Sequence, residues 1–516
     1  MIKHILKNNT LLSGNILKSS AGILLITMLV KVLGYAEKLI LANYYGTSYQ
    51  VDAYTLVLTI VLSIFFFFRE IIEPGFLNVF LDCKSNNNEK EAWNIFNKLF
   101  RWILYMTFAI SVVALIFPQG ISSIFAPGFE GERLSLTYKL IRIAIPAGIF
   151  LALSTLTSIT LNGLKIFVLP ASGELAFKGG IIICMVLFYK DYGIIGATMG
   201  IVIGSIGRLG IHLTKLYKKL TFNRTTIELK YKKRIWQLTW PLLLGVSFSQ
   251  MIGLVDNIFA SYLQEGTIAA LSYAKKVVEL PVILFPYVIS IVIFPYFAQL
   301  AVEKQDKKLT KLLGDSLKWI LIAFIPVSMF FIGYSKPIIE IVFQRGAFDT
   351  NSTMLTTKPF LVYSTGLVFF AIETILVIFY YSKADTKTPV FVGIVCVVIN
   401  ILLTWIFIQF LGYIGIALAL VIQKAIKNIV LLLLLKHKIE FSTYRLWKVL
   451  MKILGAAIIF TLMALTGKFL FNNFADNSLL KVVALVVIFT FSGAIYMAIL
   501  YFSKAIKTGK SVISNA

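Results

Sequence analysis

Apolar runs of about twenty residues recur along almost the whole chain, and they restrict its fold more than any other feature. A helix of this length can cross the ~30 Å hydrocarbon layer of a bilayer. Of the 516 residues, 58% are hydrophobic and only 14% are charged, whereas roughly a quarter of the residues of a soluble protein are charged. The sequence therefore predicts an all-α, polytopic membrane protein. About fourteen transmembrane helices are expected, at 20–43, 53–80, 97–118, 138–161, 168–189, 193–214, 238–262, 268–298, 317–343, 357–381, 389–410, 413–434, 448–471 and 480–503.

Lys and Arg residues gather in alternate connections between these helices. The segments 215–234, 303–311 and 504–510 are strongly basic, whereas 43–52 and 262–267 contain no Lys or Arg. Because cytoplasmic loops carry the excess of cations, this alternation predicts that both termini are cytoplasmic. The net charge of +25 is explained in the same way, so no nucleic-acid partner is expected.

The sequence offers no pattern typical of an enzyme or of a metal protein. It contains no Walker A loop, nucleophile elbow or HExxH motif. We therefore expect a transporter that is not an enzyme and that uses neither a cofactor nor a metal. The cysteines and histidines lack the spacing of a disulfide framework or of metal ligands: Cys83, Cys184, Cys396, His4, His212 and His437.

The two halves of the chain resemble each other at a nearly constant offset. SIFAPGF at 123–129 corresponds to IVFQRGAF at 341–348, and Gly193 and Gly412 are 219 positions apart. Six helices fit in one period, so both copies enter the membrane from the same face. This predicts two six-helix lobes related by an axis along the membrane normal, as in transporters with parallel repeats. In addition, the spacing of Gly196, Gly200 and Gly204 predicts close helix packing.

The repeat divides the chain into four expected parts. Residues 1–219 form an N-terminal lobe, 220–237 a cytoplasmic linker and 238–436 a C-terminal lobe, whereas 437–516 add two helices and a cytoplasmic tail. Substrate sites in such proteins lie between the repeats, and transport proceeds as one lobe rocks against the other. The duplication therefore favours a transporter over an enzyme or a scaffold.

Ten ionisable residues interrupt the first two helices of each half. A charged group facing lipid costs about 2.5–3.5 kcal/mol, so all ten would cost more than the ~5–15 kcal/mol net stability of a typical domain. They are therefore expected to line a water-filled cavity between the lobes. Individually, some could instead reach the headgroups or lock helices together as ion pairs. The residues are Lys31, Glu37, Lys38, Arg69, Glu70, Glu73, Asp256, Lys275, Lys276 and Glu279.

The balance of these charges favours an anionic ligand. Cations outnumber anions in the first and eighth helices, and ammonium and guanidinium groups suit phosphate or pyrophosphate. The spacing allows Arg69 to pair with Glu73, and Lys276 with Glu279. The acidic residues are assigned gating or structural roles. Glu174, Lys178 and Glu373 carry further charges, and ion pairing and ion coupling both stay open for them. The expected substrate-binding residues are Lys31, Lys38, Arg69, Lys275 and Lys276.

Three segments stand out as motifs: VKVLGYAEKLILANYYGTSYQVDAY at 30–54, SYAKKVVELP at 272–281 and ADTKTPV at 384–390. They resemble motifs of the MviN/MurJ-type lipid II flippases, which belong to the multidrug/oligosaccharidyl-lipid/polysaccharide exporter superfamily. The resemblance covers nearly the whole chain. It implies export of an undecaprenyl-diphosphate-linked peptidoglycan precursor, lipid II, across the bacterial cytoplasmic (inner) membrane by alternating access. The implied partners are the lipid-linked diphosphate saccharide, membrane lipids and cell-wall synthesis proteins.

The family's cavity arginines correspond unevenly to this sequence. The resemblance places arginine positions on Lys31 and Lys276, where the charge is kept, and on Glu37, where it is reversed. The arginine pair of the family's second helix falls either on Phe65 and Phe66 or, with a short insertion, places its second member on Arg69. The family aspartate after the first helix matches Asp52, which joins the gating or structural charges.

Three alternatives remain open at this point. The chain could move another lipid-linked oligosaccharide, or it could be a cation-coupled multidrug antiporter of the same superfamily. A membrane-embedded glycosyltransferase is a third alternative, but it would need large outer loops with acidic catalytic residues, and the outer loops here are short.

Overall fold

The computed structural model describes residues 14–222, 228–284, 286–436, 443–473, 478–503 and 505. All secondary-structure elements assigned within these ranges are helices. Nine helices there are long and apolar enough to cross a membrane, and the number rises to eleven if each of two bent pairs is one span. The predicted all-α, polytopic class is therefore confirmed, whereas the count of fourteen stays a prediction. The chain divides into two compact units, Met1–Ile268 and Ala269–Ala516.

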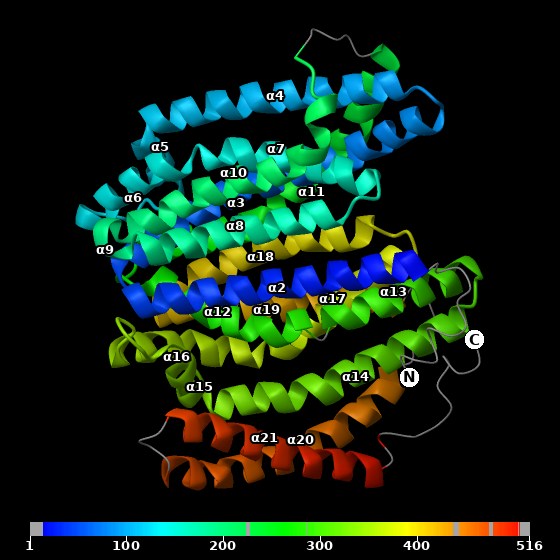
Figure 1. The fold of residues 1–516 in the computed structure, drawn as a ribbon. Coiled ribbons are helices and arrows are strands. Elements are labelled where there is room, and N and C mark those ends of the chain that lie inside the picture. Colours follow the sequence, from blue (N-terminus) through cyan, green and yellow to red (C-terminus); the bar gives the residue numbers. More distant parts are fainter. Residues whose placement is uncertain are drawn as a thin grey trace. The chain divides into compact units, whose positions relative to one another are not determined.

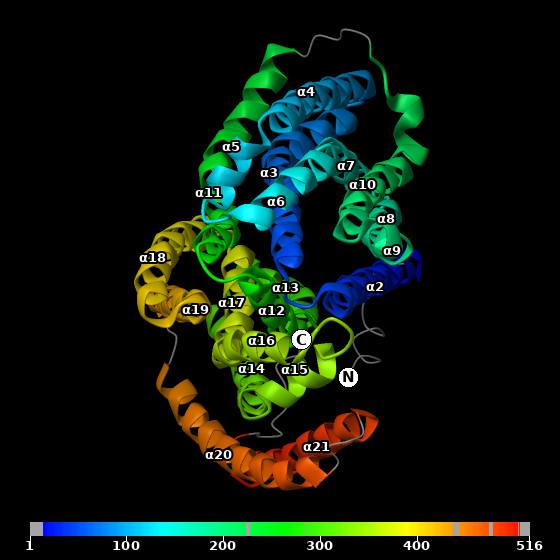
Figure 2. The ribbon, with the colours of Figure 1, turned by 90° about the vertical axis from the view of Figure 1, so that its left-hand side faces the viewer.

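The first unit is a bundle of long helices (Figures 1 and 2). Within it, α8 packs along α10, α11 packs along α3, and α2 packs along α8. Its elements are α2 (Gly14–Tyr45), α3 (Tyr49–Ser85), α4 (Glu89–Ile116), α5 (Pro118–Phe125), α6 (Gly131–Ala144), α7 (Ala147–Gly163), α8 (Val168–Leu187), α9 (Tyr189–Tyr192), α10 (Ile194–Leu216), η1 (Tyr217–Lys219) and α11 (Leu229–Ser261).

Glycines set the distance between α8 and α10. A Cβ atom on Gly204 would lie 2.5 Å from the carbonyl oxygen of Phe177, and one on Gly200 would lie 2.7 Å from the Cα atom of Ile181. Both separations are far below van der Waals contact, so a larger side chain at either position would push the helices apart. The predicted close packing is confirmed here.

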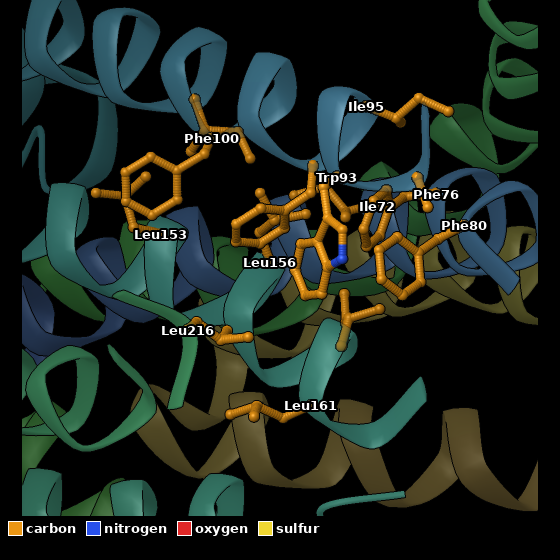
Figure 3. Close-up of a cluster of buried hydrophobic side chains, with 14 of the residues drawn as sticks. Ile72, Phe76, Phe80, Trp93, Ile95, Phe100, Leu153, Leu156, Leu161 and Leu216 are labelled. Carbon is orange, nitrogen blue, oxygen red and sulfur yellow. The ribbon is translucent and has the colours of Figure 1, made fainter. Parts of the chain in front are cut away.

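An aromatic cluster holds α3, α4 and α7 together (Figure 3). Phe76 and Phe80 are one helical turn apart on α3. The Phe80 ring packs edge-on against the Trp93 ring of α4, with 5.4 Å between the ring centroids. Leu153 and Leu156 of α7 pack against the same cluster. Large buried aromatic side chains dominate the energetics of such cores, so this cluster fixes α3, the helix that carries Asp52 and Arg69.

The second unit is also entirely helical in its described residues. In it, α18 packs along α19, and α20 packs against α21 and α14 (Figures 1 and 2). Its elements are α12 (Thr267–Leu284), which begins at the boundary, α13 (Pro286–Val302), α14 (Asp306–Gly333), α15 (Ser335–Phe343), α16 (Thr350–Thr365), α17 (Leu367–Ser382), α18 (Lys387–Leu411), α19 (Tyr413–Lys436), α20 (Thr443–Asn473) and α21 (Ser478–Phe502).

Polar contacts attach the last two helices to the rest of the second unit. The Tyr334 hydroxyl donates to the carbonyl oxygen of Ala464, and the Tyr496 hydroxyl donates to that of Ile322 at 3.0 Å. Lys481 of α21 also forms an ion pair with Glu340 of α15, at 2.9 Å. Although α20 and α21 lie outside the sequence repeat, they are therefore bound to α14 and α15.

The local structure agrees with the predicted repeat. Helices α10 and α19 begin at Ile194 and Tyr413, 219 positions apart. Each follows a glycine of the same unusual conformation: φ and ψ are 54° and −135° at Gly193, and 56° and −137° at Gly412. The bent pairs also recur, α6 with α7 at 44° and α16 with α17 at 48°. The lobe boundaries that the repeat suggests, with a linker at 220–237, stay a prediction, and residues 223–227 of that linker lie outside the described ranges.

Candidate functional site

The predicted site residues of the first unit lie on three helices. Lys31 is exposed on α2, and Lys38 is half-buried on the same helix, whereas Asp256 is half-buried on α11. Arg69, Glu70 and Glu73 are exposed on α3. The pairing that the sequence predicts within α3 is present, because the Arg69 Nε atom lies 3.4 Å from the Glu73 Oε2 atom. This pair is confirmed, and its exposure makes it weak.

Glu37 pairs with a cation from another helix. Its side chain is 1% exposed, and its Oε2 atom lies 2.5 Å from the Nζ atom of Lys178 on α8. A buried carboxylate needs such a partner because desolvation of an unpaired charge costs several kcal/mol. This ion pair connects α2 to α8, which is also the helix against which α2 packs.

A second ion pair, in which the arginine is buried, lies between α8 and α10. Arg208, whose side chain is 4% exposed, binds Glu174 with 2.7 Å between its Nη2 atom and the Oε1 atom. Its guanidinium also lies over the Phe65 ring of α3, 4.5 Å from the ring centroid. One turn along α10, the Nδ1 atom of His212 is 2.9 Å from the Thr157 hydroxyl. These contacts place a buried cation against Phe65 of α3 and a buried imidazole against α7.

Asp52 holds the turn that joins α11 to α12. Its side chain is fully buried in the first turn of α3, and its Oδ2 atom accepts a hydrogen bond from the backbone N–H of Gly266 at 2.7 Å. The same oxygen lies 2.8 Å from the Nη2 atom of Arg133 on α6. Arg133 also donates from Nη1 to the carbonyl oxygen of Leu263, at 3.2 Å. Asp52 and Arg133 together therefore fix residues 261–266, which we call the junction turn.

Two glycines bring the backbone close enough for these contacts. The N–H of Gly128 donates to the Ser261 hydroxyl at 3.0 Å, and a Cβ atom on Gly128 would lie 2.7 Å from the Ser261 backbone. Gly266 has a φ of +81°, and a Cβ atom there would lie 2.1 Å from the carbonyl oxygen of Thr47. The junction turn leaves no space for side chains at either position. It ends next to residue 268, where the first unit ends.

The second unit contains a buried charge cluster that the sequence did not predict. Glu373 of α17 binds two ammonium groups of α19: its Oε2 atom lies 2.6 Å from Lys424 Nζ, and its Oε1 atom 2.6 Å from Lys427 Nζ. We call these three residues the Glu373 cluster. It answers the question that the sequence left open at Glu373, because the carboxylate is ion-paired.

A cavity of about 510 Å³ adjoins this cluster within the second unit. Its charged lining residues are Glu279 of α12, Glu373 and Lys424, and its other walls are mostly apolar side chains of α12 and α17. Lys275 and Lys276 are half-buried on α12, within a turn of Glu279. Of the predicted site residues in the described ranges, Glu279 is thus the one that the structure places at this cavity.

In the part of the chain that the structure describes, no group of three or more His, Cys, Asp and Glu residues is arranged to hold a metal ion. His4 and His437 lie outside that part. The three cysteines are buried, and none of them forms a disulfide.

The sequence matches one family over most of its length. A family model described as "Lipid II flippase MurJ" matches residues 41–503. The chain belongs to this family. The predicted resemblance is therefore confirmed, and so is the expectation of a transporter rather than an enzyme, because the family is one of flippases.

Individual relatives agree with this assignment. The chain is 28% identical over 431 residues to the probable lipid II flippase MurJ of Buchnera aphidicola subsp. Acyrthosiphon pisum (strain APS), and the match covers 81% of this chain and 83% of that protein. It is also 28% identical over 406 residues to the lipid II flippase MurJ of Thermosipho africanus (strain TCF52B), and this match covers 78% of this chain and 82% of that protein.

Solved structures show the same fold. A structure of the lipid II flippase MurJ in an inward closed conformation matches with a TM-score of 0.78 and 25% identity, covering 94% of this chain and 99% of that one. An inward-facing multidrug transporter of the MATE family matches with a TM-score of 0.67 and 14% identity, covering 83% and 99%. The second likeness concerns the fold alone. Together, these matches identify a multi-pass membrane protein of the MurJ family.

Several of the residues that form ion pairs were not predicted from the sequence. Charges in the first two helices of each half were expected to be functional, whereas other cations were interpreted mainly as markers of cytoplasmic loops. Arg133, Arg208, Lys424 and Lys427 all lie in other helices. The signal was available, because a cation inside a long apolar segment needs a partner wherever the segment lies. Lys424 and Lys427 also have the three-residue spacing that places two side chains on one helix face.

Proposed function

We propose that this protein moves lipid II, an undecaprenyl-diphosphate-linked cell-wall precursor, from the cytoplasmic to the outer leaflet. The observation that carries this proposal is the match of the lipid II flippase family to residues 41–503. Curated relatives and a solved structure that are named as lipid II flippases support it, and their matches cover 78% to 94% of the chain.

The proposed mechanism is alternating access between the two predicted lobes. Lys31, Arg69 and Lys276 bind the diphosphate from the cytoplasmic side, Lys38 and Lys275 add positive potential, and the headgroup leaves on the outer side after the lobes rock. Lysine acts on a phosphate as a point charge and arginine as a bidentate fork. The exposed position of Lys31 and Arg69 is compatible with ligand binding.

The membrane potential is the proposed driving force. With a negative cell interior, moving two negative charges outward across the whole field gains about 4.6 kcal/mol per 100 mV. Headgroup export in cells should therefore slow when the potential is collapsed with an ionophore. Export at an unchanged rate would reject this driving force and would leave coupling to an ion as the source of energy.

The acidic residues have supporting roles in this mechanism. Glu37 and Asp52 are gating or structural charges, which fits the buried ion pairs that each of them forms. Glu70, Glu73, Asp256 and Glu279 are assigned to the same group. The protein is proposed to lie in the bacterial inner membrane with both termini in the cytoplasm, and to work beside cell-wall synthesis proteins.

Depletion in the native bacterium tests the substrate. Lipid-linked precursors are extracted and identified by mass spectrometry, and their leaflet is determined by accessibility to an external labelling enzyme. The proposal predicts that lipid II accumulates and becomes inaccessible from outside. If a different undecaprenyl-linked oligosaccharide accumulates while lipid II stays accessible, that lipid is the substrate. If no lipid-linked glycan changes, both assignments fail, and the multidrug-antiporter alternative is tested next with organic cations.

A further inference from the structure

Two ammonium groups share a single carboxylate in the second unit. Lys424 and Lys427 each lie 2.6 Å from an oxygen of Glu373, and the three side chains are only 14–19% exposed. One carboxylate balances one ammonium group, so the Glu373 cluster carries a net charge of +1. A purely structural role would require only one of the two lysines.

The excess positive charge of the Glu373 cluster lies beside a cavity. Lys424 and Glu373 line the cavity of about 510 Å³, whose walls include Val282, Phe370 and Val377. Pockets that hold ligands have volumes of about 300–1,000 Å³. Because apolar walls exclude water, they strengthen the attraction between a fixed ammonium group and an incoming anion.

Glu279 does not cancel this positive potential. It lines the same cavity from α12, but Lys275 of that helix lies within about one turn of it. Lys275, Glu279 and the Glu373 cluster contain three ammonium groups and two carboxylates, a net charge of +1. This sign of charge favours an anionic ligand.

Because Glu373 pairs with two lysines, Lys424 can be released to a ligand at a small cost in free energy. If a phosphate group binds Lys424 in place of Glu373, the Oε1 atom of Glu373 remains ion-paired with Lys427. No buried carboxylate is then left unpaired, an arrangement that would be strongly unfavourable. Lys427 therefore serves as the partner that allows Lys424 to leave.

We propose that Lys424 is an anion subsite for a phosphate group, with Glu373 and Lys427 as its positioning residues. The inference deepens the proposed function and rests on it where the phosphate belongs to the diphosphate of the lipid. A free pyrophosphate offers the same chemistry, so the experiment uses both sources.

Binding to the purified, full-length protein in phosphatidylcholine nanodiscs tests this subsite. The probes are undecaprenyl diphosphate, inorganic pyrophosphate and, as an uncharged control, undecaprenol. Lys424→Gln should weaken binding of the phosphate-bearing probe about ten-fold or more, the loss expected for one charge-assisted hydrogen bond. Lys424→Arg should restore most of the affinity, and undecaprenol binding should not change.

The matched control is Lys481→Gln. Lys481 forms an ion pair with Glu340 at 2.9 Å in the same unit. Its side chain is 18% exposed, compared with 19% for Lys424. It does not line the cavity. The control should lower the unfolding temperature without changing the affinity for either phosphate probe.

The possible outcomes separate the subsite from the proposed function. Weaker binding of undecaprenyl diphosphate identifies the lipid headgroup as the ligand, and weaker binding of pyrophosphate alone identifies a free anion; either supports the subsite. If Lys424→Gln binds both probes as tightly as wild type, the subsite is wrong, although the flippase assignment stands. If the wild-type protein binds pyrophosphate through Lys424 but does not move lipid II, the subsite stands and the proposed function fails.

Discussion

Asp52 and Arg133 form a buried ion pair, with 2.8 Å between Oδ2 and Nη2, although α3 and α6 bring them together from positions 81 residues apart. Both also bind the backbone of the junction turn, Asp52 at Gly266 and Arg133 at Leu263. Two charges are thus used to hold one short turn. The turn lies in the first unit, directly before residue 268, where that unit ends.

Replacing Arg133 with Met should release the junction turn. The change leaves Asp52 buried without its cation, which costs about 3–5 kcal/mol. Ser261, which is 1% exposed, should then become accessible. We would measure how fast a maleimide labels Ser261→Cys in a protein without its three native cysteines. We expect labelling to accelerate about ten-fold or more, since 1.4 kcal/mol already shifts an equilibrium ten-fold.

Arg234→Met is the matched control for this experiment. Arg234 also forms a close ion pair, with 2.6 Å between its Nη1 atom and the Oδ2 atom of Asp82, but its side chain is 53% exposed. Exposed pairs contribute about 0–1 kcal/mol, so labelling should stay at the wild-type rate. If Arg133→Met also leaves the rate unchanged while the protein remains folded, Arg133 does not hold the turn.

Exchanging the charges of Glu37 and Lys178 should preserve function better than either single change. Glu37→Lys or Lys178→Glu alone places two like charges at a site where the present pair is 2.5 Å apart, and each should lower both the unfolding temperature and complementation. The double exchange recreates an ion pair between α2 and α8. A double-mutant cycle should give a coupling of about 0.5–3 kcal/mol.

The result also bears on the reversed charge at Glu37. Recovery in the double variant shows that the carboxylate is part of a helix–helix contact. If the losses of stability of the two single variants simply add in the double variant, the two side chains are energetically independent, and the contact between α2 and α8 has another origin.

The repeated glycines should respond alike to substitution. Gly193 and Gly412 have φ angles of 54° and 56°, and a Cβ atom at either position would meet nothing within 4 Å. The cost of Gly→Ala there is therefore backbone strain, about 1–3 kcal/mol at each position. Unfolding of the purified variants in denaturant should show nearly equal losses, and Asn should be tolerated better than Ala.

Gly210 and Gly455 provide the controls for this comparison. Both are helical and neither has a positive φ, and a Cβ atom at either position would also meet nothing within 4 Å. Ala should leave stability unchanged there or raise it by up to ~1 kcal/mol. Losses at Gly193 and Gly412 that differ by more than about 1 kcal/mol would contradict structural equivalence of the two turns.

Much of the fold was predictable because it depends on local pattern. Apolar run length indicates a spanning helix wherever it occurs, and the offset between Gly193 and Gly412 indicates two turns of the same conformation. Arg69 and Glu73 were also predictable, since a spacing of four residues on one helix places two side chains together.

The ion pairs between helices were not predictable in the same way. Glu37 and Lys178 are separated by 141 positions, and their contact depends on how α2 and α8 are rotated about their axes. The sequence shows that Glu37 needs a partner, but not which cation supplies it. Glu174 illustrates the same point: Lys178 is available one turn away, yet Arg208 of α10 pairs with it.

Transport of lipid II by the purified protein tests the central proposal most directly. Wild-type protein, Lys31→Gln and Lys276→Gln would be reconstituted into vesicles with fluorescent lipid II, and its movement between leaflets would be followed by quenching from outside. We predict transport by the wild type and a rate reduced about ten-fold or more in each variant, because each loses one charged contact to the diphosphate. Wild-type vesicles that move lipid II no faster than protein-free vesicles would contradict the account.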